Sequence, residues 1–176
     1  DRSTCVIFGD GAGAAVLAPV EEGKGILATK IRSDGRYEEQ LYAPGGGTKL
    51  GTTHKTLDDG MHFFKMKGNE LFKVAVRSMA DISAEILEKA GCAVDDVDLV
   101  IPHQANQRIT DAVASRLGVP EEKVYSNIAE HGNTSSASIP IAIDECIQSG
   151  KIKEGSLVLL TAFGGGVTWG GTVIRF

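Results

Sequence analysis

The sequence lacks several features that would place it in a specialised class of protein. Its three cysteines, Cys5, Cys92 and Cys146, lie far apart without a Cys-x-x-Cys pair, which disfavours both a disulfide framework and a zinc site, so we expect no metal. There is no basic block, and the net charge is −5, so nucleic acid is not expected as a partner. There is also no signal-peptide pattern, and a cytoplasmic, reducing location is expected. With 42% hydrophobic and 23% charged residues, the composition is that of an ordinary globular domain.

One uncharged stretch could be mistaken for a membrane span. Residues 155–174 carry no charge and are long enough to cross a bilayer. However, the glycines at 164–166 and 170–171 would weaken a helix severely. The flanking segments, Leu157–Leu160 and Thr172–Ile174, instead predict two buried strands joined by a glycine turn, and we expect no membrane association.

Strands and helices alternate along the rest of the chain. Strands are predicted at 25–30, 98–102 and 124–126, and helices at 71–90, 107–117 and 138–149. The glycine-rich stretch 32–60 is predicted to be a long functional or mobile loop. With the two final strands the order is β-α-β-α-β-α-β-β, which predicts a layered α/β fold with a largely parallel sheet.

A weak internal repeat suggests that a second unit precedes this one. Residues 5–17 read as strand, glycine turn and strand, the same plan as residues 161–174. We therefore expect residues 1–24 to end one unit and residues 25–176 to form another, the chain being part of a larger protein. Gly9-x-Gly11-x-Gly13 is not expected to bind a dinucleotide, because a strand-like segment follows it where a Rossmann motif needs a helix.

Two polar motifs thirty residues apart are the best candidates for chemistry. They are residues 101–106, Ile-Pro-His-Gln-Ala-Asn, and residues 131–138, His-Gly-Asn-Thr-Ser-Ser-Ala-Ser. Each places a hydrogen-bonding side chain, His103 or Asn133, where a strand or loop gives way to a helix, which is where ligands collect in α/β proteins. Together the two could donate hydrogen bonds to one developing oxyanion. Taken singly, His103 could be a satisfied histidine at a strand end and Asn133 a turn residue.

In this order and spacing, the motifs resemble those of a known family. The two motifs above and residues 162–170, Ala-Phe-Gly-Gly-Gly-Val-Thr-Trp-Gly, are similar to β-ketoacyl-acyl-carrier-protein synthase III, a condensing enzyme of the thiolase-like superfamily. Residues 8–14 and 66–72 fit it too, so the resemblance covers the whole chain. It implies a layered α-β-α-β-α architecture, of which residues 25–176 would be the C-terminal βαβαβαββ half and residues 1–24 the last hairpin of the N-terminal half.

The resemblance implies an acyltransferase with a Cys-His-Asn catalytic set. A cysteine would take an acyl group from an acyl-CoA primer, acetyl-CoA above all, and the carbanion from decarboxylated malonyl-acyl carrier protein would attack it. His103 and Asn133 match the family's His and Asn. None of the three cysteines lies in the family's nucleophile motif, so the nucleophile is expected in an N-terminal half outside this chain. No cofactor is implied, because acyl-CoA is a substrate.

The resemblance also assigns the remaining site residues. Gly165 matches a backbone donor of the acyl oxyanion hole, and Phe163 an aromatic wall beside the cysteine. Asn106 and Gly68 match positions lining the pantetheine tunnel. A basic rim for docking the acidic carrier protein is implied at Lys73, Arg108 and Arg116, although these could also form an ordinary solvated helix face. A cytoplasmic homodimer taking part in fatty-acid biosynthesis is implied.

Two alternatives remain open. The chain could belong to a related thiolase-like acyltransferase, such as a polyketide or quinolone starter enzyme or a synthase that uses only CoA substrates. It could also be a fragment without activity of its own. We expect residues 1–176 alone to be insoluble or misassembled, because a hairpin without its neighbouring strands and uncovered apolar faces would be exposed.

Overall fold

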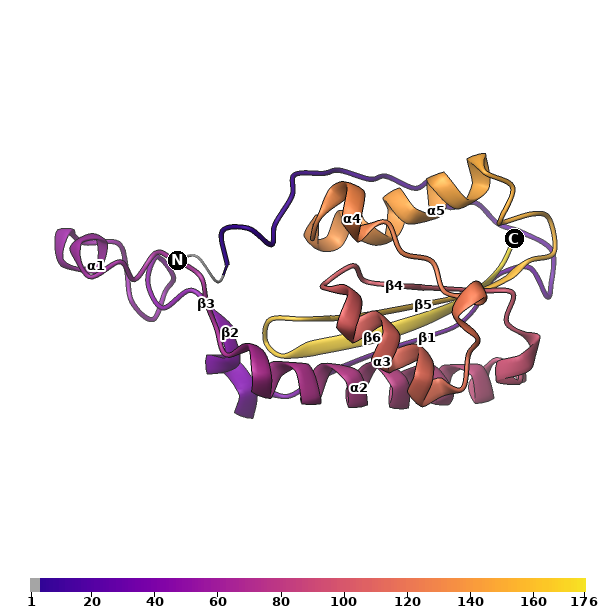
Figure 1. Cartoon of the computed structure of the whole chain (residues 1–176), viewed down its shortest axis with the longest axis horizontal. Helices are drawn as coiled ribbons and strands as arrows, with labels where there is room; N and C mark the ends of the chain where they lie inside the picture. Colours follow the sequence, from indigo (N-terminus) through magenta and orange to yellow (C-terminus); the bar gives the residue numbers. More distant parts are fainter. Residues whose placement is uncertain (1–3) are drawn as a thin grey trace.

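The core of the molecule is a four-stranded sheet. The computed structural model describes residues 4–176, so the first three residues of the predicted 1–24 segment lie outside it. The sheet order is β1-β6-β5-β4, formed by β1 (Gly25–Ser33), β4 (Leu99–Pro102), β5 (Leu157–Gly164) and β6 (Thr168–Arg175) (Figure 1). The uncharged C-terminal stretch thus forms the two predicted strands. No helix among residues 4–176 is long and apolar enough to cross a membrane.

The prediction of a largely parallel sheet is wrong. Among the four strands of this sheet as the structure describes it, β4 and β5 pair in parallel, whereas β1 with β6 and β5 with β6 are antiparallel. The strand predicted at 124–126 shrinks to one parallel bridge between Val100 and Val124. The ladder stops there because the side chain of Gln104 takes up the next backbone groups, the carbonyl of Tyr125 and the amide of Asn127.

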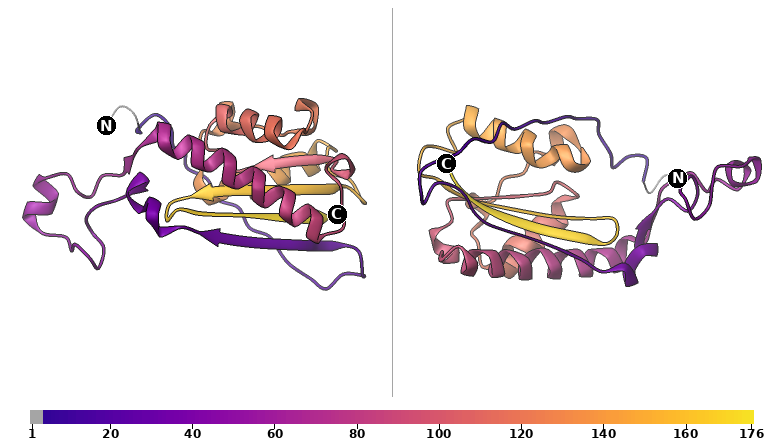
Figure 2. Two further views of the ribbon diagram at one scale, coloured as in Figure 1. Left: turned by 90° about the horizontal axis from the view of Figure 1, so that it is seen from below. Right: turned by 180° about the vertical axis from the view of Figure 1, so that it is seen from behind.

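Two helices cover one face of the sheet. They are α2 (Gly68–Lys89), which begins three residues earlier than predicted, and α3 (Gln107–Leu117), which has its predicted bounds. Figure 2 shows both lying across the sheet when it is seen from below. The amphipathic periodicity of α2 explains its place, because its buried side chains at Ile82, Ile86 and Leu87 pack on Leu159 and Val173 of the sheet.

The opposite face is covered less completely. There α5 (Ser138–Gln148) packs Ala142 and Cys146 against Leu99, Ile101 and Val158. The short helix α4 (Ile128–His131) and the 3₁₀ turn η4 (Ser135–Ala137) lead into α5. Two further 3₁₀ turns, η2 (Val94–Asp96) and η3 (Glu121–Lys123), flank the sheet. The result is three layers, helix, sheet and helix (Figure 1).

The stretch predicted as a long loop forms an arm that projects from the body (Figure 1). It contains η1 (Gly35–Gln40), β2 (Leu41–Tyr42) and the short helix α1 (His54–Asp58), and β2 pairs with β3 (Lys65–Met66). The helix begins at a capping box, in which the Thr53 side chain accepts from the Thr56 amide and the Thr56 hydroxyl accepts from the Thr53 amide. The prediction therefore placed the irregular segment correctly but missed its small elements.

The hairpin predicted at 5–17 does not form. Residues 9–20 form no strand, and they run along α4 and α5 when the molecule is seen from behind (Figure 2). Only Phe8 forms a bridge, parallel to Asn133. The segment lies against helices, which offer no strand edge, and Val16 and Leu17 are 98% and 79% exposed. The strand pattern in the sequence therefore has no partner in the part of the chain that the structure describes.

Candidate active site

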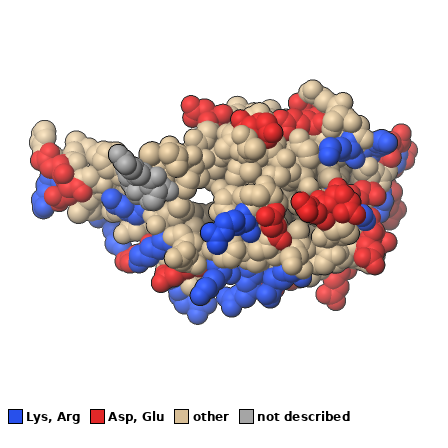
Figure 3. Space-filling view, viewed as in Figure 1, with Lys and Arg blue, Asp and Glu red and all other residues tan. Residues whose placement is uncertain are grey.

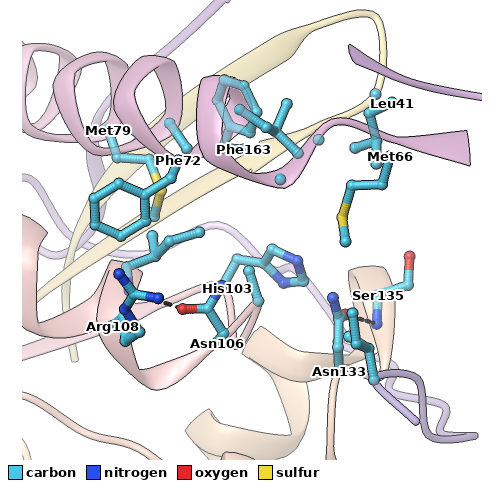
Figure 4. Close-up of a pocket in the computed structure, with 18 of the residues that line it drawn as sticks. Leu41, Met66, Phe72, Met79, His103, Asn106, Arg108, Asn133, Ser135 and Phe163 are labelled. Carbon is cyan, nitrogen blue, oxygen red and sulfur yellow. Dashed lines mark hydrogen bonds between the residues drawn. The ribbon is translucent and has the colours of Figure 1, made fainter. Parts of the chain in front are cut away.

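A cavity of about 890 Å³ lies between α2, α3 and the carboxyl ends of β4 and β5. This is the edge of the sheet at which ligands collect in α/β proteins. Both His103 and Asn133 line it, together with Gly165 and Phe163. The two polar motifs, thirty residues apart in sequence, thus meet at one cavity, where Figure 4 shows His103 and Asn133 on the same side.

His103 follows directly after the last residue of β4. Its backbone amide donates to the carbonyl of Thr161 at 2.7 Å, which extends the parallel pairing of β4 with β5 by one residue. Its Nδ1 lies 2.7 Å from the hydroxyl oxygen of Ser138, the first residue of α5. Burial lowers the pKa of His103, so the imidazole is neutral at pH 7.

Asn133 is held by both its backbone and its side chain. Its backbone amide donates to the Ile7 carbonyl at 2.9 Å, and its carbonyl accepts from the Gly9 amide at 3.0 Å. The amide of Ser135 donates to Asn133 Oδ1 at 2.9 Å. Ser135 reaches this position with a φ of 55°, in the left-handed region that non-glycine residues rarely adopt. Because Oδ1 is engaged, the Nδ2 group is the end of the amide available to a ligand in the cavity.

The glycine turn after β5 forms part of the cavity wall. Gly164 and Gly165 line the cavity, and Phe163 lines both this cavity and its neighbour. A Cβ atom at Gly165 would lie 3.2 Å from the Leu41 carbonyl oxygen, so the backbone passes close to the base of the arm. A backbone this near a cavity can present its amide to a ligand without an intervening side chain.

The two residues assigned to the tunnel also line the cavity. Gly68 is the first residue of α2, and nothing lies within 4 Å of an added Cβ there. Asn106 caps α3, its Oδ1 accepting from the Ile109 amide at 3.0 Å. The cap engages Oδ1, so only the Nδ2 group of Asn106 remains for a ligand.

The three basic residues separate into two groups. Lys73 and Arg108 line the cavity, and the guanidinium of Arg108 lies over the ring of Phe72, 5.5 Å from its centroid. Arg116 does not line it; it pairs with Asp81 at 3.2 Å. Lys and Arg gather along the face of α2, whereas Asp and Glu gather over α4 and α5 (Figure 3).

None of the three cysteines lines the cavity. Cys146 is buried in the core between α5 and the sheet, and burial raises the pKa of its thiol to about 11. A thiol with such a pKa is inert at neutral pH. Cys5 is exposed and Cys92 half-buried, and both are free. No cluster of metal-ligating side chains is found among residues 4–176.

A second, more open cavity of about 440 Å³ lies beside the first, and His103 and Phe163 line both. Its other walls come from β1, the C-terminal hairpin and the start of α5, including Ile31, Trp169 and Ser138. Ile31 is 74% exposed, so this side of the sheet is poorly covered. The imidazole of His103 therefore lies between the two cavities.

Sequence reasoning missed three residues that support the site. Gln104 is fully buried and its amide makes four hydrogen bonds: to the carbonyls of Pro102 and Tyr125, and from Ser126 Oγ and Asn127 N. Ser135 orients Asn133, and Ser138 contacts His103. All three lie inside the two motifs, but nothing in their spacing distinguished them from the flanking residues.

A further polar network joins α5 to the segment before Asn133. Glu145 accepts from Tyr125 Oη at 2.9 Å and from Asn127 Nδ2 at 2.6 Å, and it pairs with His131 Nε2 at 2.6 Å. Burial alone would raise the pKa of Glu145, but these three hydrogen bonds hold it below its ordinary value. The network anchors both ends of α4, and with them the approach to Asn133.

The fold has three layers, and a His and an Asn face a glycine turn at the ends of the strands. This is the α/β fold of the thiolase-like class. The chain belongs to the 3-oxoacyl-[acyl-carrier-protein] synthase III family. The family described as 3-oxoacyl-[acyl-carrier-protein (ACP)] synthase III C terminal matches residues 87–176, and 3-oxoacyl-[acyl-carrier-protein (ACP)] synthase III matches residues 1–35.

Known proteins resemble the chain over its whole length. It is 52% identical to beta-ketoacyl-[acyl-carrier-protein] synthase III of Aquifex aeolicus and 48% identical to that of Symbiobacterium thermophilum, covering 100% of this chain but 52% and 53% of the relatives. The crystal structure of the Aquifex protein superimposes with a TM-score of 0.88, again over 100% of this chain and 52% of that one. The priming β-ketosynthase of the R1128 polyketide pathway is 37% identical with a TM-score of 0.85, over 99% of this chain and 51% of that one. The chain therefore spans about half the length of the relatives it matches.

Proposed function

We propose that this chain is the C-terminal part of the condensing enzyme that initiates type II fatty-acid synthesis. The activity would be decarboxylative condensation of an acyl-CoA primer, acetyl-CoA above all, with malonyl-acyl carrier protein. The convergence of His103 and Asn133 on one cavity beside the glycine turn carries the proposal. Family membership supports it.

The proposed mechanism depends on two donors. When the malonyl thioester loses carbon dioxide, the electron pair of the broken carbon–carbon bond moves toward the thioester oxygen and forms an enolate. His103 Nε2–H and Asn133 Nδ2–H would donate to that oxygen. Both groups are held before the reaction starts, so they need little reorganisation as charge develops. The enolate carbon then attacks the acyl-cysteine carbonyl, and the amide of Gly165 would donate to the oxyanion of that tetrahedral intermediate. The attack forms the new carbon–carbon bond, and collapse of the intermediate restores the carbonyl, breaks the carbon–sulfur bond and releases the cysteine thiolate.

The nucleophilic cysteine would come from an N-terminal half. We assign residues 25–176 to the C-terminal half and residues 1–24 to the end of the N-terminal half. The second cavity, with Phe163 and His103 on its wall, is the place at which the cysteine-bearing segment would reach the site. The exposed Val16 and Leu17 would be covered by the same half. The complete protein is proposed to be a cytoplasmic homodimer.

The substrates would enter between α2 and α3. Phe163, Asn106 and Gly68 line this route and would contact the acyl and pantetheine groups. Lys73 and Arg108 lie at the cavity, and they would attract the acidic carrier protein and the phosphates of CoA. Arg116 would contribute only at longer range, because it is paired with Asp81 and lies about 12 Å from Arg108 along the helix axis.

A second candidate is the priming step of a polyketide pathway. The likeness to the R1128 priming β-ketosynthase favours it, and the same pair of donors would serve that reaction. The two functions differ in the primer and in the carrier protein, and residues outside this chain would contribute to both choices. Comparing acetyl-CoA with longer primers, and fatty-acid with polyketide carrier proteins, separates them.

Half-reactions of the natural protein containing this chain test the proposal. Asn133→Ala and His103→Ala should leave acylation of the cysteine intact and slow malonyl decarboxylation by about 10²–10³-fold each. The double variant should lose less than the product of the two, because the donors act as a unit. Asn69→Ala, at the cavity wall but outside the proposed machinery, is the control. Equal loss of both half-reactions would overturn the assigned roles.

A further inference from the structure

We propose that Ser138 is a positioning residue that keeps the proton of neutral His103 on Nε2. This inference rests on the proposed function, which requires Nε2 to donate a hydrogen bond to the substrate oxygen. Ser138 would be the residue that determines which ring nitrogen can donate. The starting observation is the 2.7 Å distance between His103 Nδ1 and Ser138 Oγ.

The direction of this hydrogen bond follows from the other contact of the same hydroxyl. The backbone amide of Gln104 lies 3.3 Å from Ser138 Oγ, and an amide N–H can only donate. The oxygen of Ser138 is therefore already an acceptor. Its own proton has His103 Nδ1 as the acceptor within reach, so the hydroxyl donates to Nδ1, and the ring proton must be on Nε2.

The reverse arrangement would leave a buried donor unsatisfied. If Nδ1 carried the proton, it and the Gln104 amide would both donate to Ser138 Oγ, and the hydroxyl proton would have no acceptor among the hydrogen bonds of the described residues. Ser138 is only 2% exposed even though it borders the second cavity, so little of its surface is open to a water that could take that proton. A buried hydroxyl without an acceptor is strongly disfavoured.

The place of Ser138 in its helix supports this assignment. A serine at the start of a helix commonly accepts a hydrogen bond from a backbone amide of the first turn. Here Ser138 stands one position after the N-cap residue Ala137, and α5 has no side-chain cap. The hydroxyl is thus turned away from its own helix, and it contacts the ring of His103 and the amide of Gln104.

The kind of group that contacts His103 Nδ1 determines which ring nitrogen carries the proton. A carboxylate at Nδ1 could only accept, so it would hold the proton on Nδ1 and make Nε2 a base. A hydroxyl can donate, so it leaves Nε2 as the donor. The low pKa that burial gives His103 acts in the same direction, because it keeps the imidazole from gaining a second proton.

The test is the tautomer itself, read by ¹⁵N NMR. The natural protein containing this chain is labelled with ring-¹⁵N histidine, and a His103→Gln variant identifies the signals of His103. Two-bond ¹H–¹⁵N spectra should show Nε2 protonated and Nδ1 unprotonated at pH 7. Ser138→Ala should produce a mixture of the two tautomers and lower kcat for malonyl decarboxylation by the fraction of molecules that lose the Nε2 proton, about twofold for an equal mixture, with KM unchanged.

Two further variants keep the result interpretable. Ser138→Cys preserves the volume but is a weaker donor, so its tautomer mixture and its kcat should lie between those of wild type and Ser138→Ala. Ser149→Ala removes a hydroxyl at the far end of the same helix, where its oxygen lies 2.7 Å from the Glu145 carbonyl oxygen, and should change neither. A proton on Nδ1 in the wild-type protein would overturn the inference, as would a tautomer that Ser138→Ala leaves unchanged.

The NMR result is independent of the proposed function. If His103→Ala leaves decarboxylation unaffected while the tautomer responds to Ser138→Ala, the function fails and the positioning role stands. If the half-reactions behave as proposed but the tautomer does not respond, Ser138 is a packing residue and the function stands.

Discussion

Gly9 packs directly against the backbone of His131, so closely that a Cβ atom at Gly9 would overlap the carbonyl oxygen of His131. The amide of Gly9 also donates to the carbonyl of Asn133 at 3.0 Å. Residues near the start of the chain thereby hold the backbone of Asn133, one of the two candidate site residues. The glycine is required here by this contact rather than by a turn.

Gly9→Ala should therefore destabilise the protein and displace Asn133. The added methyl group must push residues 131–133 away, at a cost of about 1–3 kcal/mol in the free energy of unfolding. Urea denaturation of the natural protein measures this cost, and the decarboxylation rate should fall with it. Gly51→Ala is the matched control, because nothing lies within 4 Å of a Cβ there. Equal stability of the two variants would contradict the prediction.

Gln104→Glu hardly changes the volume of the side chain, but we expect it to destabilise the protein. The carboxylate could still accept from Ser126 and Asn127, but it would face the carbonyl oxygens of Pro102 and Tyr125 to which Gln104 now donates. We expect a loss of about 2–4 kcal/mol in the free energy of unfolding, since a buried charge that faces two carbonyl oxygens is costly even with two donors beside it. Gln107→Ala removes an exposed amide nearby and should cost under about 1 kcal/mol. Thermal or urea unfolding compares the two.

The activity should persist below the pH at which an ordinary histidine becomes charged. Burial disfavours the imidazolium, so the pKa of His103 in the folded protein lies below 6.5. The acidic limb of kcat/KM for decarboxylation should therefore lie below pH 6.5, and His103→Gln should abolish it. The unfolded chain binds more protons in this range, so His103 also lowers stability as the pH falls through 6.5 and below. An acidic limb above pH 6.5 would contradict this reading.

Charge reversal should distinguish the two arginines of α3. Arg108→Glu places a carboxylate at the cavity, and we expect KM for the malonyl-carrier substrate to rise about tenfold or more, most strongly at low salt. Arg116→Glu should have a smaller effect on KM, because this residue does not line the cavity. Steady-state kinetics at two ionic strengths measure both. Similar effects would indicate a docking surface that extends along the whole helix.

Residues 1–176 produced alone should be insoluble or misassembled and should lack condensing activity. Val6, Val16 and Leu17 are 81%, 98% and 79% exposed, and the last two lie in the segment 9–20, which forms no strand. Adding the N-terminal half of a close relative in trans should restore solubility and activity. Size-exclusion chromatography and cooperative melting provide the readout. A soluble, monomeric, cooperatively melting product would show that the chain is self-sufficient.

The elements predicted correctly from the sequence are those whose hydrophobic residues are buried within this chain itself. The α3 helix has its predicted bounds, and the two C-terminal strands follow from their apolar runs. The 5–17 hairpin and the 124–126 strand failed for a common reason. A strand pattern records the tendency to pair but not whether an edge is available, and here one segment lies on a helix and the other is taken up by Gln104.

The site was only partly predictable from the sequence. The motifs predicted that His103 and Asn133 would come together, because polar residues at the ends of strands are informative in an α/β fold, and both line the same cavity. The residues that orient them could not be found in that way. The contact of Ser138 with His103 depends on where α5 begins relative to β4, and the contact of Ser135 with Asn133 depends on a backbone angle. Neither quantity is visible in residue types or spacing.

The left-handed conformation of Ser135 has a consequence for how Asn133 behaves over time. A serine with a φ of 55° is held there by its surroundings, at a cost of about 1 kcal/mol or more. Its amide is thereby aimed at Asn133 Oδ1 and opposes rotation of the Asn133 amide about its terminal bond. A side-chain amide that is free to flip would spend part of its time presenting oxygen, an acceptor, to a substrate oxygen and would repel it. The strained turn thus disfavours rotation of the Asn133 amide. Ser135→Gly would relax the turn, and the resulting rotation would appear as exchange broadening of the Asn133 side-chain NH₂ signals.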